Sequence, residues 1–126
     1  MVTEVYDIET LSNLFTYTGY CLQDGLYYQF VIHNSMNQTE ELYTHLKREK
    51  NMYQVGYNNE AFDYPVLHYF LLNYNRLKTL SGQEVAQELY AKAQEVITSD
   101  EFQTIWDNQK IISQGTFGIQ LDQVKL

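Results

Sequence analysis

The stretch that decides the fold is Val2-Thr3-Glu4-Val5-Tyr6-Asp7-Ile8-Glu9-Thr10. Its β-branched and aromatic residues predict a first strand over about residues 2–8. Because alternate side chains of a strand point to opposite faces, we expect Asp7 and Glu9 side by side, with Tyr6 and Ile8 on the other face. Two adjacent carboxylates repel each other unless a cation lies between them, and Mg²⁺ takes such oxygen ligands. The other interpretation is an edge strand whose carboxylates face water.

A second segment carries another carboxylate. It reads Val55-Gly56-Tyr57-Asn58-Asn59-Glu60-Ala61-Phe62-Asp63-Tyr64-Pro65-Val66-Leu67. Residues 54–57 predict a short parallel strand, and the glycine and asparagines after it predict a turn. The apolar spacing beyond Asp63 predicts a helix over residues 64–75. Asp63 would then lie near the start of that helix, where the ordinary role of aspartate is an N-cap that accepts a backbone hydrogen bond.

Together, V-Y-D-I-E-T and G-Y-N-N-E-A-F-D-Y-P-V-L resemble motifs I and II of the DEDD 3′→5′ exonuclease superfamily. This superfamily is the DnaQ-like branch of the RNase H-like fold and includes the proofreading domains of DNA polymerases. The resemblance covers about residues 2–75. It implies an α/β fold with an RNase H-like mixed sheet and flanking helices. A strand expected at residues 119–121, closed by Asp122, resembles the strand that follows motif II.

The resemblance also implies a function and a set of site residues. The chain would remove nucleotides from the 3′ end of a nucleic acid by two-metal hydrolysis, with DNA as the first expected substrate and RNA as the alternative. The residues that would bind Mg²⁺ or Mn²⁺ and act in catalysis are Asp7, Glu9 and Asp63. The residues that would contact the substrate are Thr10, Tyr57, Asn58 and Phe62.

One part of the family pattern has no match. The fourth acidic residue belongs to a Y-x-x-x-D or H-x-x-x-x-D motif, and neither pattern follows Asp63. Acidic residues available in other patterns are Asp100, Glu101, Asp107 and Asp122. We therefore expect residues 1–126 to form a single, incomplete exonuclease-like domain that lacks the C-terminal motif III helix. A second chain or self-association would complete the domain and cover the apolar surface left open.

The composition fits a folded domain in a reducing compartment. The chain has 126 residues, of which 44% are hydrophobic, so it can bury a sizeable core. It contains no run of apolar residues long enough for a membrane span and does not begin like a signal sequence, so we expect no membrane contact. A single cysteine, Cys21, excludes an internal disulfide. We expect a cytoplasmic protein with Cys21 in its core.

Charge and aromatic content qualify the nuclease hypothesis. A net charge of −8 argues against binding driven by counterion release, although bound cations reverse the local field of acidic ligands. The basic residues near the second segment lie where we expect solvated helix ends rather than phosphate contacts; they are Lys47, Arg48, Lys50, Arg76 and Lys78. Strand-like runs contain several of the twelve tyrosines, and we expect half-buried sheet packing for Tyr17, Tyr20, Tyr27 and Tyr28.

The remaining sequence predicts more strands and helices. Residues 16–22 and 26–33 should form a hairpin through Asp24-Gly25. A helix should run from Thr39 to about residue 49, and Ser81 to Glu84 has the pattern of a capping box before another helix. Further helical turns are expected around residues 102–106, followed by a loop over residues 113–118.

Three functions stay open from the sequence. The first is the exonuclease, and the second is a non-catalytic RNase H-like module that binds protein or nucleic acid. The third is an α/β adaptor in which the motif matches are accidental. Metal binding distinguishes the first from the third, and activity after addition of a motif III segment distinguishes the first from the second.

Overall fold

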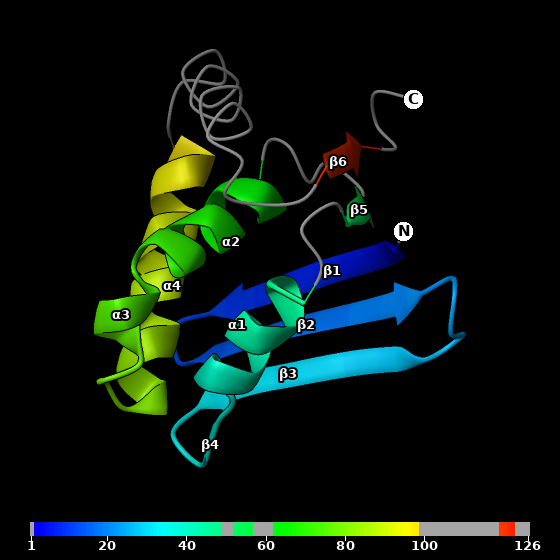
Figure 1. The fold of residues 1–126 in the computed structure, drawn as a ribbon. Coiled ribbons are helices and arrows are strands. Elements are labelled where there is room, and N and C mark those ends of the chain that lie inside the picture. The colour runs from blue at the N-terminus through cyan, green and yellow to red at the C-terminus, as the bar shows by residue number, and fades with distance from the viewer. Residues whose placement is uncertain (1, 49–51, 57–61, 99–118, 123–126) are drawn as a thin grey trace.

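The computed structural model describes residues 2–48, 52–56, 62–98 and 119–122. Within them, helices pack against one face of a sheet (Figure 1). The strands are β1 (Thr3–Leu11), β2 (Leu14–Cys21), β3 (Tyr27–His33), β4 (Met36–Asn37), β5 (Tyr53–Gly56) and β6 (Ile119–Asp122). The helices are α1 (Thr39–Leu46), α2 (Asp63–Leu72), α3 (Tyr74–Leu77) and α4 (Gly82–Thr98).

The sheet is mixed, with the strand order β4-β3-β2-β1-β5-β6. Strands β1, β2 and β3 pair in an antiparallel meander. Strand β5 then pairs parallel to β1, and β6 pairs parallel to β5. The predicted α/β class with a mixed sheet and flanking helices is confirmed. So are the short parallel strand of the second segment, which is β5, and the last expected strand, which is β6.

Two local predictions are confirmed by backbone geometry and hydrogen bonds. The hairpin turns at Gly25, whose φ of 69° lies in the left-handed region that glycine adopts readily. Asp24 supports this turn by accepting a hydrogen bond from the Leu26 amide at 2.8 Å. At the start of α4, the Ser81 hydroxyl accepts from the Glu84 amide, and the Glu84 carboxylate accepts from the Ser81 amide. This is the predicted capping box.

Several predicted boundaries are wrong. Strand β1 continues to Leu11 because Leu11 pairs with Leu14 across a tight turn. The helix expected over residues 64–75 divides at Asn73, whose side-chain amide donates to the Tyr69 carbonyl. Asp63 is the first residue of α2 rather than its N-cap, a position that Phe62 occupies. The short β4 was not predicted, and the expectations for residues 102–106 and 113–118 lie outside the described residues.

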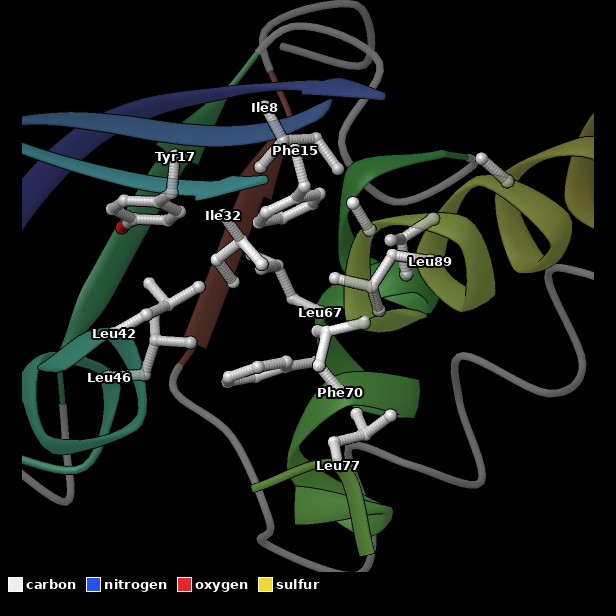
Figure 2. Close-up of a cluster of buried hydrophobic side chains, with 14 of the residues drawn as sticks. Ile8, Phe15, Tyr17, Ile32, Leu42, Leu46, Leu67, Phe70, Leu77 and Leu89 are labelled. Atoms are coloured by element: carbon white, nitrogen blue, oxygen red, sulfur yellow. The ribbon is translucent and has the colours of Figure 1, made fainter. Parts of the chain in front are cut away.

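The core lies between the helices and one face of β1, β2 and β3. Figure 2 shows side chains of the sheet and of the helices pointing toward one another. The buried sheet residues include Ile8, Phe15, Tyr17 and Ile32, and the helical ones include Leu42, Leu46, Leu67, Phe70 and Leu89. No helix of the described residues is long and apolar enough to cross a membrane. The expected core position of Cys21 is confirmed by its burial.

The tyrosines of the meander do not share one environment. Tyr20 and Tyr28 are half-buried, as expected. The expectation is wrong for Tyr17, which is fully buried, and for Tyr27, which is 77% exposed. Tyr17 faces the helices. Because side chains alternate along β3, Tyr27 points to the face that no described helix covers.

The core also contains a charged side chain, Glu4, which is fully buried. Its carboxylate accepts a hydrogen bond from the Tyr17 hydroxyl and from the Arg48 guanidinium at 2.8 Å. The His45 ring Nε2 lies 2.9 Å from the same carboxylate. The Gln54 amide donates in turn to the Tyr17 hydroxyl at 3.2 Å. This Glu4 network joins β1, β2, β5 and the C-terminal end of α1.

The partners of Glu4 determine its charge. Burial raises the pKa of Glu4, but its hydrogen bonds with His45, Tyr17 and Arg48 and the nearby His45 outweigh burial, so the pKa of Glu4 lies below its usual value. Burial and the charge of Glu4 raise the pKa of Tyr17 well above its usual value. At neutral pH the network therefore contains a carboxylate and a neutral phenol.

A mutation of Glu4 should destabilise the fold. We expect Glu4→Gln to lower the free energy of unfolding by about 3 kcal/mol, because Arg48 and His45 lose the charge that they surround. Urea denaturation followed by circular dichroism measures this change. The matched control is Glu41→Gln on the exposed side of α1, which should change stability by less than about 0.5 kcal/mol.

Gly19 offers a second variant for the same network. A Cβ atom at Gly19 would lie 2.5 Å from Cδ of Glu4, so Gly19→Ala must displace the carboxylate from its partners. Gly19→Ala should therefore be destabilising as well, although alanine suits a strand better than glycine. Wild-type stability in both variants would show that the buried charge contributes nothing to the fold.

His68 of α2 should make stability depend on pH. Burial, followed by the charge of Lys92, lowers the pKa of His68 to about 4. The folded chain therefore excludes a proton that the unfolded chain binds below about pH 6.5, so stability is highest above this pH and falls as pH drops toward 4. His68→Gln should flatten this slope in urea titrations, whereas His33→Gln on β3 should retain it. An unchanged slope in His68→Gln would contradict the assignment.

Candidate functional site

Asp7 and Glu9 lie on the face of β1 that the described helices leave open. Both side chains are exposed, while Tyr6 and Ile8 between and beside them are buried in the core. The predicted alternation along β1 is therefore confirmed. Two carboxylates at this spacing on one strand face lie roughly 7 Å apart along the strand direction.

Among the described residues, the strands that border this carboxylate pair present polar groups and no positive charge. On the neighbouring strand, Asp7 lies opposite Thr18 and Glu9 lies opposite Thr16, so hydroxyl groups border both carboxylates. The open face of β1, β2 and β3 contains no Lys or Arg. The pair therefore presents uncompensated negative charge, which favours a bound cation.

Asp63 has a different environment from the pair. It begins α2, the helix that follows β5 along the chain, and β5 is the parallel neighbour of β1. Its side chain is only 5% exposed. Within the described residues, no three His, Cys, Asp or Glu side chains gather closely enough to hold a metal ion. The structure thus brings Asp7 and Glu9 together and does not bring Asp63 into one group with them.

The donor chemistry of Asp7 and Glu9 nevertheless fits one divalent ion. Mg²⁺ usually takes one or two carboxylates and completes its octahedron with water and substrate phosphate. Two exposed carboxylates on a strand face leave those other positions open to solvent and substrate. The expected second metal, with Asp63 as a ligand, stays a prediction.

The residues expected to contact substrate fall in several places. Thr10 alternates away from Asp7 and Glu9, lies opposite Phe15 of β2 and is half-buried on the helix side of the sheet. Phe62 is half-buried and packs against the core cluster. Tyr57 and Asn58 lie outside the described residues. In the described part of the chain, neither Thr10 nor Phe62 shares a face with the carboxylate pair.

The two arginines form ion pairs within the protein. Arg48 belongs to the Glu4 network, and Arg76 forms a salt bridge with Glu88 of α4. Lys47 and Lys78 follow the last residues of α1 and α3, and the Lys78 ammonium lies 5.6 Å from the centre of the Tyr74 ring. The expected helix-end position is thus confirmed for the two lysines. Lys50 lies outside the described residues.

The role of Glu4 was not predicted from the sequence. A signal was present, because Glu4 precedes Tyr6 and Ile8 in the same alternating phase and so shares their face. Its partners His45 and Arg48 lie far along the chain and have the spacing of one helical turn. Strand phase could therefore have predicted a carboxylate on the core face, whereas its partners depend on tertiary structure.

Comparison with known proteins identified no relative of this chain. None of the protein-family models, curated proteins or solved structures compared with this chain matches it. A functional interpretation therefore depends on the side chains and strand arrangement described above.

Proposed function

We propose that this chain provides the first two carboxylate motifs of a metal-dependent 3′→5′ exonuclease domain with an RNase H-like fold. The observation that carries the proposal is the exposure of Asp7 and Glu9 on one face of β1. Strand β1 lies between its antiparallel neighbour β2 and its parallel neighbour β5. Apart from the two-residue β4, the chain begins with the order βββαβα, which supports the RNase H-like fold that the two motifs imply.

The charges and hydroxyl groups of the site indicate the role that each residue would have. Asp7 and Glu9 would hold a divalent ion, since a cation relieves the repulsion between them. When bound, Mg²⁺ or Mn²⁺ would activate the attacking water and stabilise the leaving oxygen of the phosphodiester. Thr16 and Thr18 border the carboxylates and can hydrogen-bond to water or phosphate oxygens there. A nucleic acid with a free 3′ end, DNA rather than RNA, is the proposed substrate.

The proposed site needs groups beyond those described. The sequence has no motif III downstream of Asp63, so no general base is assigned. A second chain, or a second copy of this one, is the proposed source of the missing acid and of a cover for the open face. Such a cover would also exclude water from the carboxylates, which strengthens electrostatic interactions.

The non-catalytic alternative stays open. Asp63 is nearly buried at the start of α2 and forms no metal-binding group with Asp7 and Glu9. An RNase H-like interaction module would retain this arrangement without cleaving its partner. Nuclease activity therefore has to be measured separately from metal binding.

Metal binding should depend on the carboxylate pair. We expect the chain to bind Mn²⁺ in isothermal titration calorimetry and Asp7→Asn to weaken binding by about 10-fold or more, because one of two ligands loses its charge. The matched control is Glu41→Gln on α1, which removes an equal charge from another exposed surface. Equal affinities in Asp7→Asn and the wild type would rule out the site.

Cleavage by residues 1–126 alone should be slow. We expect Mn²⁺-dependent loss of nucleotides from a 3′-labelled single strand at a rate about 10²–10⁴-fold below that reached when a motif III segment is added, because no base is positioned. Gel electrophoresis over a time course measures both rates. Glu9→Gln should abolish the residual activity, and residual cleavage that survives this substitution would show that the carboxylate pair is not its source.

A further inference from the structure

The open face is hollowed beside Asp7. The hollow has a volume of about 520 Å³, and the residues that line it are Val5, Tyr6, Asp7, Thr18, Gly19, Tyr20 and Tyr27. Tyr6 and Gly19 are paired across β1 and β2, and the side chain of Tyr6 is buried on the other face. Because Tyr6 and Gly19 both belong to the inward-facing phase of their strands, their backbone forms the floor of the hollow. The side chains around it form the walls, and we call this hollow the tyrosine groove.

The walls of the tyrosine groove combine aromatic and polar groups. The rings of Tyr20 and Tyr27 lie with centroids 4.8 Å apart and planes tilted by 46°, and Tyr27 is 77% exposed. On the side toward Asp7, the Thr18 hydroxyl lies 3.4 Å from the side-chain amide of Gln29. An exposed aromatic pair provides faces on which a planar ligand can stack. The hydroxyl, amide and carboxylate provide hydrogen-bond partners for the edge of such a ligand.

We propose that the tyrosine groove binds one unpaired nucleobase of a single-stranded nucleic acid. This inference rests on the proposed function, because it places the base next to the carboxylate pair that would bind the phosphate through a metal ion. A nucleobase has apolar faces and a polar edge, which match the tyrosine rings and the Thr18 side of the groove. Base–aromatic stacking binds single strands without requiring a particular sequence.

Stacking, and not charge, determines which form of nucleic acid fits. The open face of β1, β2 and β3 carries Asp7 and Glu9 and no Lys or Arg, so it attracts the phosphate backbone of neither a duplex nor a single strand. A base that is paired and stacked in a duplex cannot offer its face to Tyr27. Affinity therefore comes from stacking in the groove and from the metal ion, and it requires an unpaired strand.

Binding of a fluorescently labelled pentathymidine in Ca²⁺ tests the groove. We expect Tyr27→Thr to weaken binding by about 10-fold in fluorescence anisotropy, because one stacking surface is lost. Tyr27→Phe should retain wild-type affinity, since the ring face remains. Tyr90→Ala on α4, which removes a half-buried tyrosine elsewhere, is the matched control and should bind as the wild type does. A blunt duplex should bind more weakly than the single strand.

Three results would overturn the proposal. The first is that the wild type does not bind pentathymidine. The second is that Tyr27→Thr binds pentathymidine as tightly as the wild type does. The third is that Tyr27→Thr weakens binding of the single strand and of the duplex by the same factor. Mn²⁺ calorimetry on the same proteins reports the metal site independently. If Asp7→Asn and Glu9→Gln bind Mn²⁺ as the wild type does, the metal site is rejected. If oligonucleotide binding in the same experiments still depends on Tyr27, the groove is retained.

Discussion

The buried carboxylate of Glu4 is the constraint on which the arrangement of this protein depends. Its bonds with Tyr17, His45 and Arg48 attach α1 to the sheet and fix which face of β1 turns inward. Because side chains alternate, an inward Glu4 places Asp7 and Glu9 outward. A slip of one residue would bury that pair without partners and expose Tyr6 and Ile8, at a cost of several kcal/mol for the unpaired buried charges. The structural carboxylate thus determines where the carboxylates of the proposed metal site lie.

The two faces of the meander then have separate roles. The inward face supplies the core under α1, α2 and α4 (Figure 2). The outward face keeps an uncompensated acidic pair beside an aromatic groove. An acidic protein of this kind can engage nucleic acid through a bound cation and base stacking, neither of which needs a basic surface. The proposed cleavage site and the proposed base site therefore depend on the same exposed face, although different atoms provide each interaction.

Local patterns explain what the sequence could predict. The alternation around Asp7, the Asp24-Gly25 turn and the Ser81–Glu84 capping box depend on neighbouring residues, and the structure contains all three. Tertiary contacts explain the rest. A glutamate in a strand usually faces water, and the bonds with Tyr17, His45 and Arg48 allow Glu4 to be a core residue. The Tyr20–Tyr27 pair depends on the register of β2 with β3, which the sequence of one strand does not reveal. The burial of Asp63 depends on the packing of α2, which the sequence around Asp63 does not reveal.

Paramagnetic broadening of backbone amide signals by Mn²⁺ tests the central claim most directly. The claim is that the outward carboxylates of β1 form the cation site of this fold. At substoichiometric Mn²⁺, the account predicts selective loss of the NMR signals of Asp7, Ile8 and Glu9 and of their β2 partners Thr16 and Thr18. Signals of the acidic first turn of α1, at Glu40 and Glu41, should persist. Broadening centred on α1, or spread evenly over all exposed carboxylates, would contradict the account.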